Sequence, residues 1–325
     1  MADITVKFIV QKRAAKSDIK DFERSATTSS KNVTSSFGSL KTNAGKLLGA
    51  AGVAGIALSA GTAVKRGFSR AIEAGKEFES QLANLEAITG ITGDDLERLG
   101  ETALEVSTRW GESASNIIEA NKLVASQLAE EIDFNTEVGI RQLEQISEQA
   151  IVLQKAAGID LKTAVETTTQ VVNQFGLSVA EAGDATNVLA AGAKFGAAEV
   201  PDIARALENA GVAANGAGLS ISETTTAIEF LAKNAIRGEK AGTALRAVFL
   251  RLQTRSQELA EFGINNVNIQ ADGLAGTLEK LQPIVNNTAA LKKVFGEEAF
   301  NAAQALIAES DALEDFNEKI QGTNT

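Results

Sequence analysis

Two short stretches of this sequence decide its fold: GLSVAE at residues 176–181 and GLSISE at residues 218–223. In each stretch a Ser is followed three residues later by a Glu. This is the capping-box pattern, in which the Ser hydroxyl and the Glu carboxylate satisfy unpaired N–H groups at a helix N-terminus. The Gly-Leu pair before each Ser is typical of the end of a preceding helix. Each stretch therefore predicts the junction between two helices.

The residues around the two junctions also match one another at an offset of 42 residues, with Leu189 matching Leu231 and Ala190 matching Ala232. A third, looser copy begins at residues 158–160. Similarity of this kind predicts a repeated helical hairpin. Chance similarity between Ala-rich helices is the alternative interpretation.

From about residue 68 onward the sequence carries almost only helix patterns, because apolar residues recur at spacings of three and four and Gly marks the breaks. We predict a short extended piece at residues 267–269 and an interruption at Pro283. The fold class is all-α, a multi-helix array of repeated helical hairpins. The expected helices cover residues 68–90, 94–109, 114–131, 136–157, 161–174, 201–212, 240–262 and 288–319.

The chain begins differently. Apolar residues alternate with other residues from Ile4 to Val10, which predicts a short N-terminal β-strand. A polar linker or weak helix follows. We therefore divide the chain into a basic N-terminal part at 1–45, a Gly/Ala-rich apolar helix at 46–67 and a helical domain at 68–325.

The Gly/Ala-rich helix contains 18 uncharged residues, from Leu47 to Val64. A helix of that length spans roughly 27 Å, the lower limit for a bilayer. One interpretation is a segment that enters a membrane or packs tightly in a homo-oligomer. The other, which we favour, is a helix buried in the protein's own assembly, because membrane insertion rewards Leu and Ile more than Gly. Small residues that allow close helix approach recur every four positions, at Ala51, Gly55, Ser59 and Ala63.

Composition argues against most enzyme classes. The 325 residues include no Cys and no His, which excludes thiolate nucleophiles, thiol-ligated zinc and imidazole bases. The stretch from Asp133 to Glu144 has partial calcium-loop spacing, but Val138 stands where the loop needs Gly. A simple helix cap at Asp133 or Asn135 is the preferred interpretation. We expect no catalytic residue, no metal site and no cofactor.

Charge is distributed unevenly. Residues 1–80 carry 13 Lys and Arg against 7 Asp and Glu, whereas residues 81–325 carry 18 against 35. The formal net charge of the whole chain is −11. A basic head and an acidic body indicate different surroundings for the two parts. We expect no specific nucleic-acid partner.

Roughly residues 70–310 resemble the shared core region of phage tail tape measure proteins. The resemblance is most specific in its last third. It is carried by Phe78–Leu82, Ile88–Gly90, Gly111–Ala114, Phe175–Leu177, Gly218–Ser220, Glu223–Thr225, Leu231–Ala232, Ile236–Gly238, Ala241–Arg246 and Val294–Gly296.

The resemblance implies a non-enzymatic scaffold and ruler for tail-tube assembly, located in the tube lumen of the virion and in the host cytoplasm during assembly. It implies ejection ahead of the DNA, with some members aiding genome passage across the host inner membrane. The implied partners are the tail-tube protein, tail assembly chaperones, tail-tip or baseplate proteins and further copies of the chain. Members of this family usually run for many hundreds of residues, so the resemblance implies a truncated or processed part, or a short member. The alternative function is a membrane-active helical protein, either pore-forming or a secreted effector.

Overall fold

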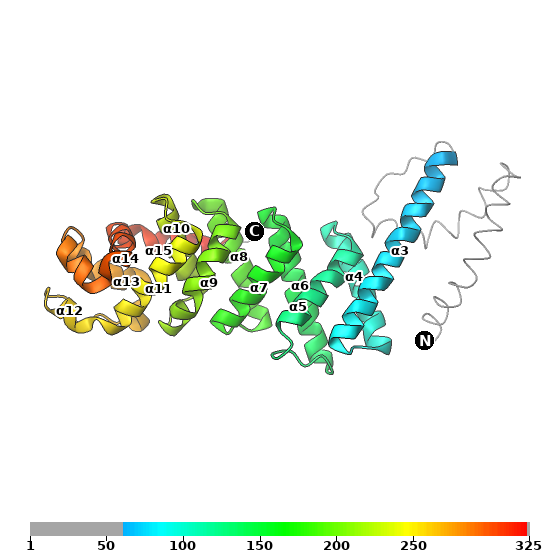
Figure 1. The fold of residues 1–325 in the computed structure, drawn as a ribbon, viewed down its shortest axis with the longest axis horizontal. Helices are drawn as coiled ribbons and strands as arrows, with labels where there is room; N and C mark the ends of the chain where they lie inside the picture. The colour runs from blue at the N-terminus through cyan, green and yellow to red at the C-terminus, as the bar shows by residue number, and fades with distance from the viewer. Residues whose placement is uncertain (1–60, 324–325) are drawn as a thin grey trace, which may run out of the picture. The chain divides into compact units, whose positions relative to one another are not determined.

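The structure, a computed structural model, describes residues 61–323 and the side chains from Glu73 onward. Every regular element in this part is helical (Figure 1), which confirms the all-α class. The predicted N-terminal strand and most of the Gly/Ala-rich helix lie outside the described residues. The chain divides into two compact units, residues 1–122 and 123–325, which are described separately.

The first unit contains α3 (Gly61–Thr89), α4 (Gly93–Trp110) and the first part of α5 (Ala114–Gln127). α3 and α4 pack on one another, with Gly100 of α4 facing α3. A Cβ atom at Gly100 would lie 3.4 Å from Leu82 Cδ1 and 3.5 Å from the ring of Phe78. The side chains of Leu85 and Leu99 are fully buried.

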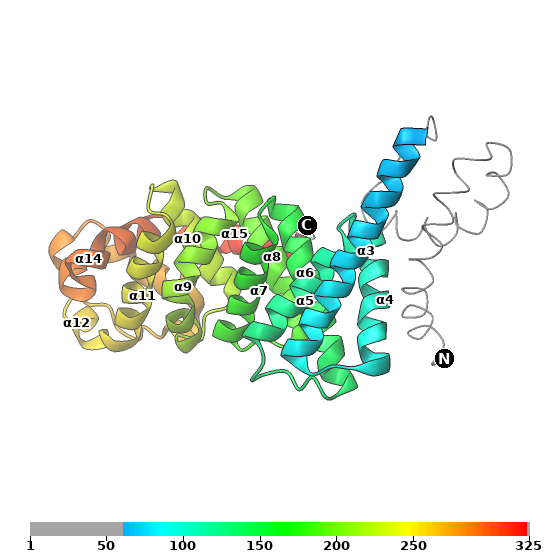
Figure 2. The same ribbon diagram turned by 45° about the vertical axis from the view of Figure 1, so that its right-hand side comes forward.

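The second unit is built from helices that lie side by side in Figures 1 and 2. Its hydrophobic core runs from α6 to α15, with Phe230, Phe249 and Phe295 among its largest fully buried side chains. The helices are α6 (Glu137–Ala157), α7 (Leu161–Phe175), α8 (Val179–Phe195), α9 (Val200–Gly216), α10 (Ile221–Lys233), α11 (Gly238–Thr254), α12 (Ser256–Ala260), α13 (Ile269–Lys280), η1 (Gln282–Ile284), α14 (Thr288–Ala308) and α15 (Ser310–Gln321).

Helices two apart in the chain pack parallel to each other. On α11, Gly238 faces Asp202 of α9, and Gly242 faces Ala206 one turn further along both helices. A Cβ atom at Gly242 would lie 2.3 Å from the carbonyl oxygen of Ala206, so the backbones approach closely because this residue has no side chain. The pairs α7/α9 and α8/α10 follow the same pattern, with Gln174 against Gly211 and Thr225 against Gly192.

Two helices near the C-terminus are kinked at glycines with positive φ, and a long charged side chain holds each kink. After Gly273 of α13, the N–H of Leu274 donates to Glu223 Oε1 at 2.9 Å. Before Gly296 of α14, the carbonyl of Val294 accepts from Arg251 Nη1 at 3.3 Å. An acid caps a helix start and a base caps a helix end, as the helix dipole favours.

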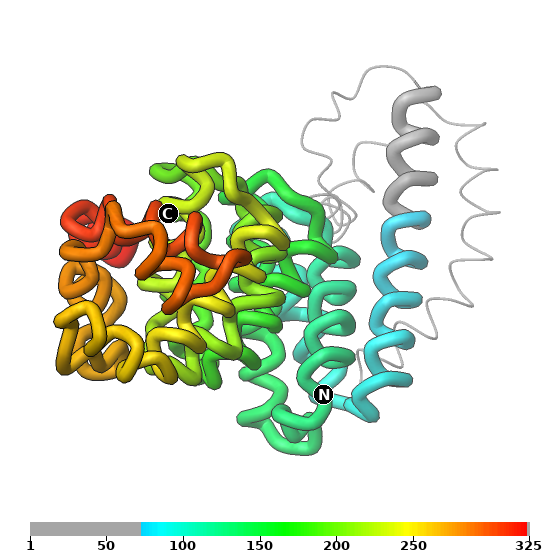
Figure 3. The backbone as a smooth tube through the Cα atoms, turned by 60° about the vertical axis from the view of Figure 1, so that its left-hand side comes forward, coloured from blue at the N-terminus to red at the C-terminus, as the bar shows by residue number. Residues whose placement is uncertain are grey.

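The last helix, α15, packs against α8, α10 and α13. Figure 3 shows the orange and red C-terminal segments lying against the yellow and green helices. The buried hydroxyl of Ser222 donates to Asn317 Oδ1 at 2.5 Å, and the rings of Phe230 and Phe316 meet edge to face at 5.7 Å. The C-terminal helix is thus an integral part of the second unit.

Both predicted capping boxes are present, at Ser178 with Glu181 and at Ser220 with Glu223. That these starts belong to a repeated hairpin stays a prediction. The prediction of a single helix at 288–319 was wrong. The chain forms two helices there, α14, which is kinked at Gly296, and α15, and they are separated at Glu309. The prediction of an extended piece at 267–269 was also wrong at Ile269, which is the first residue of α13. There the Asn268 side chain accepts the N–H groups of Gln270 and Ala271 and so starts α13.

Candidate functional site

The centre of α10 carries an ionisable group in the core. Residues 224–232 of this helix are all buried. Glu229 lies among them with no exposed surface, and it is the one charged residue in the buried class within the described part of the chain. A buried carboxyl group is costly unless it is neutral or well hydrogen-bonded, so its surroundings decide what it does.

The Glu229 side chain closes the turn between α8 and α9. Its Oε2 atom accepts the backbone N–H of Ala197 at 2.6 Å and that of Ala198 at 2.8 Å. Gly196 makes room for the carboxyl group, and Gly192 makes room for its neighbour Thr225. A Cβ atom at Gly196 would lie 1.9 Å from Oε2, and one at Gly192 would lie 2.6 Å from Thr225 Cγ2. The turn is therefore shaped around this carboxyl group.

The electrostatic balance at Glu229 favours its neutral form. Burial raises the pKa of the carboxyl group to about 7, although the hydrogen bonds from Ala198 and Ala197 and the charges of Arg237 and Lys233 lower it. The other carboxyl oxygen, Oε1, is buried and has no hydrogen-bond partner among the described residues. The group can thus exchange a proton near neutral pH.

Three lysines lie on aromatic rings close to this site. The Lys233 ammonium is 3.6 Å from the ring centroid of Phe230. Lys319 and Lys194 lie 4.1 and 5.4 Å from the ring centroid of Phe195, the residue before Gly196. The contact of Lys319 with Phe195 joins α15 to α8, and Lys233, 5.8 Å from the ring centroid of Phe316, joins α10 to α15.

The Glu229 carboxyl group is engaged in a contact within the fold. Oε2 is occupied by the chain's own backbone, and the neighbouring hydroxyl of Thr225 is buried in the same core. No cluster of three or more Asp or Glu side chains that could hold a metal occurs among the described residues. The site therefore positions a turn of its own fold.

The structure tests few of the residues singled out from the sequence. Ala51, Gly55 and Ser59 lie outside the described residues, and Ala63 lies in the first turn of α3. Among the helices that are described, none combines the length and apolar character needed to cross a bilayer.

The calcium-loop stretch is a helix start, but the cap is neither Asp133 nor Asn135. Thr136 is the N-cap of α6, and its hydroxyl accepts the N–H of Gly139 at 3.1 Å. Asp133 Oδ1 accepts the N–H of Asn135 at 3.0 Å and so closes the turn before it.

Sequence reasoning did not find Glu229. A Glu within a helix is normally read as solvated, and its partners lie 31 and 32 residues earlier. The available signal was the uncharged run around it, from Thr224 to Ala232, which is interrupted by this one acid. A second signal was the spacing of Gly192, in the last turn of α8, and Gly196, the residue that follows that helix.

Comparison with known proteins supplies the family. Residues 100–325 match the phage-related minor tail protein family. The chain is also 30% identical over 189 residues to a tape measure protein of Pneumococcus phage Dp-1. That alignment covers 57% of this chain and 16% of the relative, so the chain corresponds to a small part of that protein. No solved structure matches the chain. The match over 100–325 covers most of the chain, which therefore belongs to the phage-related minor tail protein family.

Proposed function

We propose that this chain acts as part of a phage tail tape measure, a scaffold on which tail-tube subunits assemble and a ruler that sets the length of the tube. The observation that carries the proposal is the 30% identity to a tape measure protein, within a family match that spans residues 100–325. The all-α fold supports it, because helix rise gives a fixed length per residue.

The proposed location is the lumen of the tail tube, with the host cytoplasm as the site of assembly. The proposed partners are the tail-tube protein, assembly chaperones, tail-tip or baseplate proteins and other copies of this chain. The acidic body supports a further point. A surface with 18 Lys and Arg against 35 Asp and Glu repels DNA, so the chain would not hold back a genome that leaves through the same tube.

The two units suit different tasks in this proposal. α3 is one continuous helix of 29 residues and would measure about 44 Å. The helices of the second unit fold back on one another, so its residues add far less length. We propose that continuous helices of the α3 kind measure length and that the second unit is a compact module at one place in the tail. The division into parts at 1–45, 46–67 and 68–325 belongs to the same proposal.

Protease protection of intact virions tests the lumenal location. Protease is added to purified virions and to virions whose tails have been emptied by triggered ejection, and antibodies to the second unit follow the chain. The proposal predicts full protection before ejection and release of the chain after it. Tail-tube protein serves as the loading control. Digestion in intact virions, or retention in emptied tails, contradicts the lumenal and ejected role.

A second candidate function rests on residues 47–64, an uncharged stretch of 18 residues. We propose that Ala51, Gly55, Ser59 and Ala63 form a close-packing face, either in the assembly or in the host inner membrane during ejection. Purified chain is mixed with liposomes and treated with protease. Protection of this segment together with dye leakage favours the membrane role or a membrane-active effector. Complete cleavage without leakage rules both out.

A further inference from the structure

We propose that Glu229 is a proton-operated latch. With its proton bound, the carboxyl group holds the α8–α9 turn against α10, and loss of the proton loosens this closure, so that the turn separates from α10 more readily. The latch is a property of the folded second unit and does not depend on the role of the chain in the tail.

The geometry identifies the contact as a latch. Glu229 reaches out of α10 and takes up the N–H groups of two consecutive residues, Ala197 and Ala198, in a turn that belongs to two other helices. The missing side chain at Gly196 leaves the space that the carboxyl group fills, and the one at Gly192 leaves space for the neighbouring Thr225. No other buried residue in the described part of the chain combines an ionisable group with a contact of this kind.

The two N–H bonds to Oε2 strengthen when the carboxyl group is ionised and so lower its pKa, but burial of the whole group outweighs them and favours the neutral acid. In the neutral acid the carbonyl oxygen accepts both N–H groups with its two lone pairs, which matches Oε2. The hydroxyl is then Oε1. The Thr225 hydroxyl lies one helical turn earlier and, like Oε1, is buried without a hydrogen-bond partner among the described residues. An ionised carboxylate would place charge on Oε1 with no donor to receive it.

The charged groups that face the site do not reverse this preference. Lys233 of α10 and Arg237 of the α10–α11 connection lower the pKa of Glu229, but both are exposed and screened by water. Lys194 of α8 and Lys319 of α15 sit over the ring of Phe195. On the α9 side the acid at the N-cap is Glu199, which is exposed.

The direction of the pH effect follows from the burial of the carboxyl group, which outweighs its hydrogen bonds and the nearby positive charges. The pKa of Glu229 rises from 4.5 to about 7 on folding, so between these values the folded chain holds a proton that the unfolded chain has released. The closure is therefore complete at and below pH 4.5 and weakens as the pH rises through about 7.

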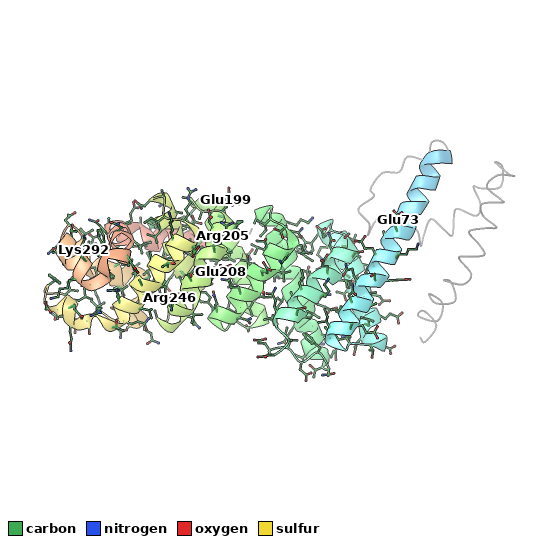
Figure 4. The ribbon with its side chains drawn as sticks, viewed as in Figure 1. Glu73, Glu199, Arg205, Glu208, Arg246 and Lys292 are labelled. Atoms are coloured by element: carbon green, nitrogen blue, oxygen red, sulfur yellow. The ribbon has the colours of Figure 1, made fainter. Side chains whose placement is uncertain are left out.

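Hydrogen exchange of the full chain tests the latch. Protection factors of the Ala197 and Ala198 amides are measured by NMR from pH 5.5 to 8.5, corrected for the pH dependence of intrinsic exchange. We expect protection to fall about tenfold or more in the wild type, and to stay within twofold in Glu229→Gln, which keeps an acceptor but cannot ionise. Glu208→Gln removes an exposed acid from α9, shown on the helix surface in Figure 4, and should behave as the wild type does.

Either of two results overturns the proposal: flat protection in the wild type, or an equal fall in Glu229→Gln. If Glu229→Gln does not fold, carbon-13 titration of the wild-type Glu229 carboxyl decides. A midpoint between pH 6 and 8 supports the latch, and a midpoint below pH 5 overturns it.

Discussion

The Oε2 atom of the Glu229 carboxyl group lies 2.6 Å from the backbone nitrogen of Ala197, across 32 residues of sequence. The turn between α8 and α9 is therefore closed by a side chain from α10, and not by its own backbone alone. This contact joins three helices through one ionisable group, and it sits inside the part of the chain that matches the phage minor tail family.

Gly196→Ala tests how tightly the turn is shaped around Glu229. The new Cβ atom would lie 1.9 Å from Oε2, so either the turn or the carboxyl group must move. We expect a loss of about 2 kcal/mol or more in the free energy of unfolding, measured by urea denaturation. Gly216→Ala is the control, because nothing lies within 4 Å of its Cβ position and stability should hold or rise slightly. Equal stability of the two variants would show that the turn accommodates a Cβ atom at residue 196 without strain.

Gly242→Ala tests the close approach of α11 to α9. A Cβ atom there would lie 2.3 Å from the backbone oxygen of Ala206, and backbone cannot swing aside as a flexible side chain can. The expected cost is about 2–3 kcal/mol. Gly276→Ala in α13 meets only an ordinary contact at 3.7 Å and should cost nothing. A Gly242→Ala protein as stable as the wild type would mean that the two helices do not pack as described.

Ala235→Gly should stabilise the chain. Ala235 follows α10 with φ of 61°, a left-handed conformation that Gly adopts without strain. We expect a gain of about 0.5–1 kcal/mol in thermal or urea unfolding. The opposite sign is expected for Ala156→Gly, an exposed position within α6 where Gly weakens the helix. A loss of stability in Ala235→Gly would contradict the assigned turn.

Ser222→Ala should loosen the C-terminal helix. The substitution leaves the buried Asn317 Oδ1 without the hydroxyl that donates to it at 2.5 Å. We expect a cost of about 1–3 kcal/mol and faster hydrogen exchange in α15 than in α9. Thr243→Ala, an exposed change on α11, is the matched control and should leave both quantities unchanged. Uniform destabilisation without early exchange in α15 would show that this helix is not held by the bond.

Local signals carried the sequence-based prediction of helices. A capping box needs only four residues, so Ser220 and Glu223 could be recognised without any knowledge of the fold. The same Glu223 also caps the kinked helix after Gly273. That contact joins residues 51 positions apart, so no local sequence pattern predicts it.

The helix boundaries that were predicted wrongly from the sequence depend on tertiary packing. The break at Glu309 carries neither Gly nor Pro, and it exists because α15 turns back onto α8, α10 and α13. The burial of Glu229 is likewise a tertiary property, since neighbouring helices bring the amides and the space for it. The pattern of a helix is local, whereas the environment of one side chain within it is not.

Tail length in the phage or prophage that carries this gene is the most direct test of the ruler role. Virions are produced with the gene deleted, and with the deletion complemented by the wild-type chain or by a variant lacking α3, and their tails are measured by negative-stain microscopy. A ruler role predicts no tails of defined length without the gene, normal tails on complementation, and tails about 44 Å shorter without α3. Tails of normal number and length in the absence of the gene would contradict it.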